Sequence, residues 1–226
     1  MLSSSDREAE AIPSYESPDL VSALLSFGAA DLSASGGGVD LLLEKACAIR
    51  QWQLGGSHPR FVVNHWVEVM LVGADQAHCR VLNAATHVTL RPLTLDNLLK
   101  TIGQQLQQVE AHQTAPDFAQ RLMAAYDLLA EEVASAGEGL PEVPLHQIYL
   151  YLKQQQPTYA RMHFGLDLFY ALENGLLLDR NPSLLPDETV PRKERYYLPD
   201  FGLEPQQALP SVHRLLLSPA LQSLEI

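Results

Sequence analysis

The sequence is poor in cysteine, with only Cys47 and Cys79 among its 226 residues. A lone pair of cysteines in a chain without a signal peptide predicts two reduced core thiols rather than a disulfide. The first residues lack the basic and then apolar layout of such a peptide. No apolar run approaches the roughly 18–20 residues that are needed to cross a membrane. We therefore expect a cytoplasmic protein without membrane contact.

The sequence also lacks the short motifs that bind cofactors or carry catalytic groups. It contains no GxxxxGK(S/T) phosphate loop, no GxGxxG after a strand, no GxSxG elbow and no CxxC pair. The eight histidines and two cysteines show no paired zinc-ligand spacing. We expect no metal, no cofactor and no catalytic residue. The alternative is an enzyme whose site is assembled from scattered residues such as His65, Glu68 and Asp167.

Basic residues are scarce, since 15 Lys and Arg face 27 Asp and Glu and give a formal charge of −12. This acidity disfavours non-specific binding of nucleic acid by the body of the protein. Only 19% of the residues are charged, whereas 46% are hydrophobic. The chain can therefore bury a real core and still leave apolar surface for a partner.

Residues 1–38 form an acidic, Ser-rich segment that we expect to be disordered apart from one short helix. The apolar stripe of that helix consists of Leu20, Leu24, Leu25 and Phe27. A Gly/Ser linker follows at 33–38 and gives the helix freedom to dock onto a partner subunit. Packing of the same helix on its own domain is the alternative.

Residues 39–137 are predicted to form a helical domain with one β-hairpin. Apolar periodicity predicts helices over 39–53, 95–112 and 117–136, the second of them capped by Thr94. For residues 61–72 periodicity does not separate helix from strand, and we favour a helix. Residues 79–82 and 87–90 flank a turn and predict a hairpin. The order helix, helix, hairpin over 39–95 is that of a winged-helix-like unit.

Residues 141–202 are predicted to form a winged-helix-like domain. Two helices are expected at 145–156 and 158–173, with Thr158 as the N-cap of the second and Asn174-Gly175 at its end. A short strand is expected at 176–178, and residues 184–185 pair with 195–198 across a wing loop at 186–194. Residues 203–226 are a tail that packs back on the domain or binds a partner. The predicted fold class is mainly α with small β-hairpins, an α+β protein with one or two winged-helix-like units joined by helices.

The predicted wing carries a basic cluster formed by Arg192, Lys193 and Arg195. In winged-helix proteins that bind DNA, cations at this place contact phosphates. Arg161, near the start of the preceding helix, is the fourth candidate for a DNA contact. The alternative is that these charges only keep an exposed hairpin tip in solution, because carboxylates at 187, 188 and 194 dilute the cluster.

Residues 162–172 (MHFGLDLFYAL), followed by GLLL at 175–178, form a helix-then-wing pattern. This pattern resembles the small winged-helix accessory subunits of bacterial SMC- or Rad50-like ATPases in condensin-like and anti-phage complexes. The resemblance implies a non-catalytic interaction subunit whose protein partner is an ATPase or a kleisin-like chain, with DNA contacted indirectly. It covers about a quarter of the chain and transfers no functional residue. A homodimer is compatible with it, and a DNA-binding regulator that uses the wing is the alternative function.

Overall fold

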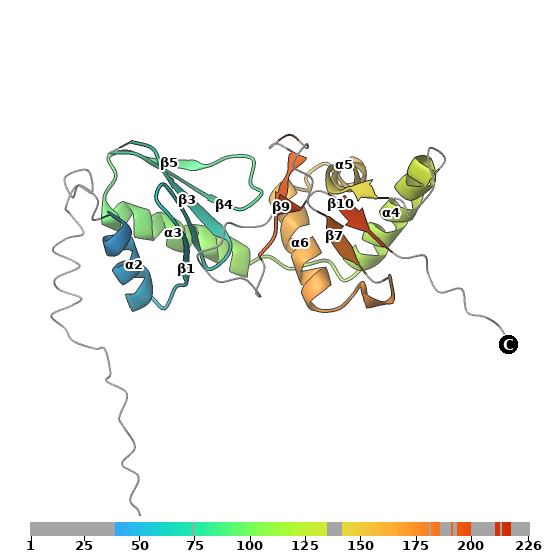
Figure 1. Ribbon diagram of the computed structural model, residues 1–226, viewed down its shortest axis with the longest axis horizontal. Helices are drawn as coiled ribbons and strands as arrows, with labels where there is room; N and C mark the ends of the chain where they lie inside the picture. Colours follow the sequence, from blue (N-terminus) through green and yellow to red (C-terminus); the bar gives the residue numbers. More distant parts are fainter. Residues whose placement is uncertain are drawn as a thin grey trace, which may run out of the picture.

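The computed structural model describes residues 39–73, 75–134, 142–180, 182–185, 191, 194–199, 211–212 and 214–217. The chain forms two units that lie side by side, each with its own helices and antiparallel strands (Figure 1). The predicted α+β class is confirmed. Among the described helices, none is long and apolar enough to cross a bilayer.

The first unit is a five-stranded antiparallel sheet with two helices on one face. Its elements are α2 (Val39–Ile49), β1 (Leu54–Ser57), β2 (Arg60–Val63), β3 (Val67–Leu71), β4 (Ala77–Val81), β5 (Val88–Leu90) and α3 (Leu95–Glu110). Each strand pairs with the next one along the chain. Phe61, Val69 and Cys79 of the sheet pack with Leu98 and Ile102 of α3 in one buried cluster. Residues on the opposite side of the strands form what we call the outer sheet face.

The helix expected over residues 61–72 is wrong, because these residues form β2, a turn and β3. Asn64 and His65 make the turn with φ angles of 46° and 61°, in the left-handed region. The outer sheet face includes two apolar side chains, those of Val62, which lies opposite Glu68, and of Met70, which lies opposite Arg60. These apolar side chains hide the period of two from the sequence pattern. The order helix, helix, hairpin predicted for 39–95 is therefore wrong as well.

Other predictions for the first unit are confirmed. The predicted hairpin at 79–82 and 87–90 is the antiparallel pair β4 and β5. The helices predicted to begin at residues 39 and 95 are α2 and α3. Thr94 caps α3, since its Oγ1 accepts a hydrogen bond of 3.3 Å from the backbone N–H of Asn97. The two cysteines are free and buried, as expected.

The second unit packs three helices against a three-stranded sheet and adds a short two-stranded ribbon. Its elements are α4 (Phe118–Ala134), β6 (Val143–Pro144), α5 (Leu145–Gln155), α6 (Arg161–Glu173), the 3-10 helix η2 (Leu178–Arg180), β7 (Ser183–Leu185), β8 (Tyr196–Tyr197), β9 (Ser211–Val212) and β10 (Arg214–Leu216). The sheet has the order β6-β10-β7, and the ribbon is β8-β9. The ribbon lies between the two units (Figure 1). The three predicted helices of this half of the chain are thus confirmed as α4, α5 and α6.

Two local predictions around α6 are wrong. Thr158 is not its cap, because α6 begins at Arg161 after Ala160, which makes no capping side-chain bond. Residues 176–178 do not form a buried strand, since Leu178 belongs to η2 and is 72% exposed. The predicted end of α6 is confirmed, with Gly175 at a φ of 66° just after the C-cap residue Asn174.

The predicted pairing across residues 186–194 is also wrong. β7 pairs with β10, and Tyr196–Tyr197 of β8 pair with β9. Both partner strands come from the segment 203–226 that was expected to be a tail, and Leu215 and Leu217 of this segment are buried. Strands of two or three residues carry too little periodicity for sequence to choose their partners.

The two units share a continuous hydrophobic contact. The buried cluster of the second unit also contains Trp66, Val81 and Leu82 from the first unit. The rings of Trp66 and Phe169 meet edge to face, with centroids 5.2 Å apart. We call this contact between the sheet unit and α6 the seam.

Candidate functional site

Only part of the predicted site lies among the described residues. The apolar stripe Leu20, Leu24, Leu25 and Phe27 lies outside them, and so do Arg192 and Lys193. Arg161 and Arg195 are described, and the structure brings these two together. The guanidinium of Arg161 donates a hydrogen bond to the carbonyl of Arg195 at the base of the predicted wing.

Arg161 also lies over the ring of Tyr196, with its Cζ 4.4 Å from the ring centroid. Tyr196 is fully buried against Tyr149 and Phe164 of the second unit. Burial raises the pKa of its hydroxyl well above the usual value, so Tyr196 stays neutral. Arg161 is therefore fixed by an aromatic face and a carbonyl at the N-terminus of α6.

The next residue of β8, Tyr197, faces the other unit. Arg60 of β2 lies over the Tyr197 ring, with its Cζ 5.2 Å from the centroid. Asn83, just after β4, bonds both backbone groups of Tyr197, since it donates to the carbonyl and accepts from the N–H at 2.9 Å each. Consecutive strand residues point to opposite sides, so β8 links the base of the wing to both units.

The face of α6 that turns away from its own unit is covered by the seam. Residues 164–169 of α6 are all buried. A Cβ built on Gly165 would overlap the Asn83 Nδ2 atom and lie 3.2 Å from its Cγ. Only a glycine therefore allows Asn83 to approach α6 this closely. A helix that enters the major groove of DNA needs a free face, and residues 164–169 of α6 offer none in this arrangement.

A buried carboxylate on the second turn of α6 lies in the seam and contacts the first unit. Asp167 is 2% exposed, and its Oδ1 lies 2.7 Å from Nε2 of His112, which follows α3. The hydroxyl of Tyr159 donates to the other oxygen, Oδ2, at 2.5 Å. His163 stacks on His112 with ring centroids 5.0 Å apart. The ion pair of His112 and Asp167 joins the two units when the imidazole is protonated.

Two pKa shifts follow from this environment. Burial, and then the hydrogen bond to Asp167, raise the pKa of Tyr159 well above its usual value. Burial lowers the pKa of His163, and the neighbouring His112 lowers it further, while Asp167 acts in the opposite direction. Tyr159 is thus a neutral hydrogen-bond donor, and His163 is a neutral ring at physiological pH.

The residues of the enzyme alternative are not brought together. His65 Nε2 bonds the Gln53 side chain at 2.6 Å, Glu68 pairs with arginines of the sheet, and Asp167 lies in the seam. The described part of the chain contains no group of three His, Cys, Asp or Glu side chains that could hold a metal ion.

Sequence reasoning missed an ionic cluster on the outer sheet face. Glu68 is 5% exposed, with its Oε1 2.5 Å from Nε of Arg60 and its Oε2 2.6 Å from Nε of Arg80. Arg80 lies directly opposite Glu68 in the register of β3 and β4. In the sequence, Arg60, Glu68 and Arg80 each alternate with buried residues. A strand assignment for 60–63 and 67–71, beside the predicted strand at 79–82, would have placed the three charged side chains on one face of a sheet.

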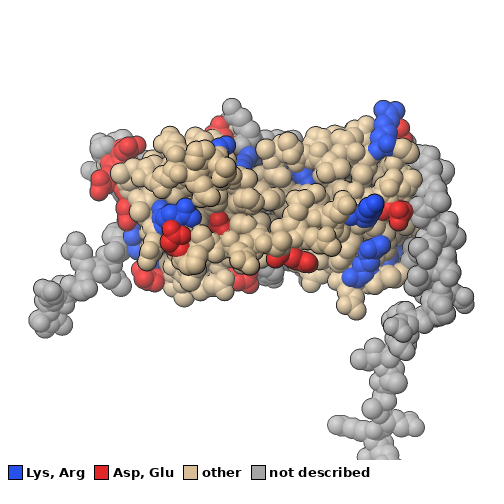
Figure 2. Space-filling model, turned by 180° about the vertical axis from the view of Figure 1, so that it is seen from behind, with Lys and Arg blue, Asp and Glu red and all other residues tan. Residues whose placement is uncertain are grey.

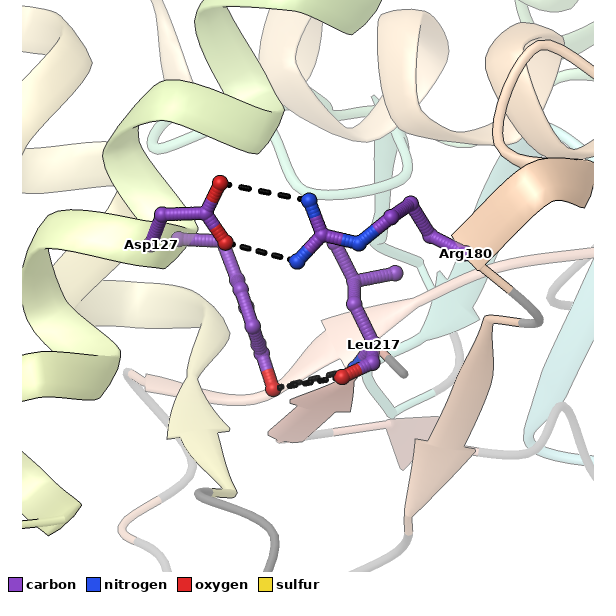
Figure 3. A network of polar contacts seen from close by, with 4 residues as sticks. Asp127, Arg180 and Leu217 are labelled. Carbon is purple, nitrogen blue, oxygen red and sulfur yellow. Dashed lines mark hydrogen bonds and ion pairs between the residues drawn. The ribbon is translucent and has the colours of Figure 1, made fainter. Parts of the chain in front are cut away.

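Polar contacts at the far end of the second unit fix its last strand (Figure 3). The hydroxyl of Tyr126 on α4 donates to the Leu217 carbonyl at 3.3 Å and accepts from its N–H at 3.0 Å. Asp127 holds the guanidinium of Arg180 in η2 with two hydrogen bonds, of 2.6 and 3.2 Å. This contact raises the pKa of Arg180, which remains cationic. The arrangement is structural, because every group in it is used to join α4 to η2 and to the end of β10.

Comparisons of the chain with protein-family models, with characterised proteins and with solved structures found no match.

Proposed function

We propose that this chain is a non-catalytic interaction subunit of a larger complex, and that its second unit is a winged-helix module used for protein contact. The order α4, β6, α5, α6, β7, β10 with the sheet order β6-β10-β7 supports the module. The observation that carries the proposal is the burial of α6 in the seam. A winged-helix regulator would present this helix to DNA, whereas here it joins two units into one body.

Apolar side chains remain exposed on this body. Leu176 and Leu178, just after α6, are 48% and 72% exposed. Leu128 on α4 is also exposed and neighbours Asp127, which binds Arg180 of η2. Figure 2 shows that charged side chains are sparse on the face turned toward the viewer, with wide uncharged areas between them. Large apolar residues that remain exposed in this number favour a protein partner.

The partner that the helix-then-wing pattern suggests is an SMC-like ATPase or a kleisin-like chain acting on DNA. Native co-purification of the tagged chain at low salt tests this, with sizing of the complex and identification of the bound chain. Stoichiometric recovery of such a partner is expected. Recovery of the chain alone, as a monomer or a homodimer, would contradict the proposal.

A variant pair locates the contact. Leu176→Ser with Leu178→Ser should abolish recovery of the partner while the urea midpoint stays close to that of the natural chain, because both residues are exposed. Leu41→Ser with Ile49→Ser on α2, where both side chains are also exposed, is the matched control. If both pairs retain the partner, the contact lies elsewhere on the body.

A second candidate function is contact with DNA phosphates through the wing. The observation that favours it is the contact between Arg161 and Arg195, which gathers two of the four predicted cations at one place. Replacing Arg192, Lys193 and Arg195 with alanine should abolish DNA binding and flatten its salt dependence. Unchanged binding by this triple variant would exclude the wing.

A further inference from the structure

We propose that the seam is a pH-sensitive joint, in which protonation of the stacked pair His112 and His163 opens the contact between the two units. The two rings belong to different units, since His112 follows α3 and His163 lies on α6. Opening of the seam therefore parts the rings. The inference goes beyond the proposed function and does not depend on the identity of a partner.

The two rings of the stack differ in their relation to the buried carboxylate of the seam. Nε2 of His112 lies 2.7 Å from Oδ1 of Asp167, and the hydroxyl of Tyr159 donates to Oδ2. A proton on His112 therefore completes an ion pair across the seam. A second proton, on His163, places another cation against the first ring, with the ring centroids 5.0 Å apart. The first proton strengthens the joint, and the second weakens it.

The groups that form the joint are shielded from water. The side chains of His112 and Asp167 are 11% and 3% exposed, so solvent screens the charges around them only weakly. Burial lowers the pKa of His163, and the neighbouring His112 lowers it further, against a smaller opposing effect of Asp167. When the seam opens, His163 meets water and its pKa returns toward the ordinary value. The open form thus binds protons more readily than the closed form.

Other titratable and charged groups around the stack come from α4, from β8 and from the start of α6. Burial raises the pKa values of Tyr159 and Tyr196, so both phenols stay neutral. Arg121 of α4 is paired with Asp117 at 3.2 Å, and Arg161 lies over the Tyr196 ring. Histidine is the side chain whose ordinary pKa places its charge change between pH 5 and 8. We therefore assign the acid response of the joint to the stack.

The sign and the size of the response follow from proton linkage. Because the open form binds the second proton more readily, the ratio of open to closed chains rises as pH falls below the ordinary histidine pKa of about 6.5. If the closed form excluded that proton completely, the ratio would rise about tenfold between about pH 7.5 and about pH 5.5. Partial exclusion gives a smaller rise, and we expect about three- to tenfold.

The backbone N–H of Tyr197 reports on the opening, because it donates across the seam to Oδ1 of Asn83 at 2.9 Å. Its hydrogen exchange is measured by NMR as a protection factor, which removes the intrinsic dependence of exchange on pH. The reference is the N–H of Leu71, which donates to the carbonyl of Pro59 within the first unit at 2.8 Å. Tyr197 should be less protected than Leu71 at each pH, because the seam opens without unfolding of the first unit. Its protection should fall about three- to tenfold between about pH 7.5 and about pH 5.5.

Three variants assign the response to the stack. His163→Phe keeps an aromatic ring against His112 but takes up no proton, so the protection of Tyr197 should no longer fall with pH. His163→Gln is a second neutral variant, with a smaller side chain, and the same result is expected. His87→Phe is the matched control, since His87 stacks on His78 inside the first unit with centroids 3.9 Å apart. This control should respond to acid like the natural chain.

Several results would overturn the inference. One is constant protection of Tyr197 in the natural chain between these pH values. Another is an equal fall in His163→Phe and His163→Gln, or loss of the response in His87→Phe, because the stack would then not be its source. Equal protection of Tyr197 and Leu71 would show that the seam opens only when the whole chain unfolds, and the seam would then be no joint.

Discussion

Replacing Gly165 with alanine tests whether the seam holds the two units as one cooperative body. In an exposed helix interior this change stabilises a protein by about 1 kcal/mol, because alanine is the better helix former. Here the new Cβ would overlap the side chain of Asn83. Asn83 cannot move away without losing its two hydrogen bonds to the backbone of Tyr197.

The magnitude of the change in unfolding free energy follows from one of two alternative costs and from one gain. Loss of two hydrogen bonds costs about 1–3 kcal/mol in total. Overpacking of the seam, if Asn83 stays in place, costs about 1–3 kcal/mol. These are alternative responses to one clash, and the helix preference offsets about 1 kcal/mol of either. We expect Gly165→Ala to lower the free energy of unfolding by up to about 2 kcal/mol, a decrease in Tm of up to about 8 °C for a body of this size.

The assay is urea unfolding of a double-mutant cycle with Asn83→Ala. Once the amide is gone, the Cβ at position 165 has room, and Gly165→Ala should stabilise the chain by up to about 1 kcal/mol. The sign of the effect therefore reverses, and the coupling energy is about 1–3 kcal/mol. Gly103→Ala on α3 is the control, because its Cβ would lie at an ordinary 3.7 Å from the Trp52 ring. The reasoning is refuted if Gly165→Ala stabilises the natural chain as Gly103→Ala does.

Three further predictions concern single groups. Because the pKa of His163 is lowered in the folded chain, the unfolded chain binds more protons as pH falls through the ordinary histidine range. The urea midpoint should therefore drop between about pH 7.5 and about pH 5.5, and it should drop less in His163→Phe; equal decreases would contradict this. Burial raises the pKa of Cys47 to about 11 and that of Cys79 to about 12, so Ellman's reagent should label both thiols in urea and neither in the native chain. Rapid labelling of native protein would show that the sheet opens readily. Tyr126→Phe should lower the free energy of unfolding by about 1–3 kcal/mol, since it removes the hydroxyl that bonds both backbone groups of the buried Leu217; an unchanged urea midpoint would argue against this contact.

The helices could be predicted from the sequence, because each carries an apolar stripe over three or more turns. The strands were harder for two physical reasons. β2 and β3 place apolar residues such as Val62 and Met70 on the outer sheet face, so the alternation is lost. β8, β9 and β10 are two or three residues long, and their partners depend on tertiary packing rather than on local pattern.

The candidate site shows the same division. Arg161 and Arg195 were chosen from their charge and place, and the structure brings them into contact. Arg60 and Arg80 were missed, because their shared face exists only once β2 and β4 flank β3. The partner of Asp167 could not be found either, since His112 lies in the other unit and no local spacing connects the two. Contacts between distant segments leave no periodic signal in the sequence.

The placement of β10 in the middle of its sheet has a consequence for the order of folding. Leu215 pairs with Val143 and Leu184 pairs with Leu215, so β6 and β7 have no partner in this sheet until the chain has passed residue 214. The helices α5 and α6 lie between β6 and β10 in sequence, so the side of each helix that packs on this sheet has no complete sheet to cover it before β10 is in place. Closing so long a loop is slow, because its entropy is lost before the new contacts form. All strands of the first unit precede β10 in the chain, so Trp66 with its neighbours is available to cover α6 before the sheet of the second unit can be completed.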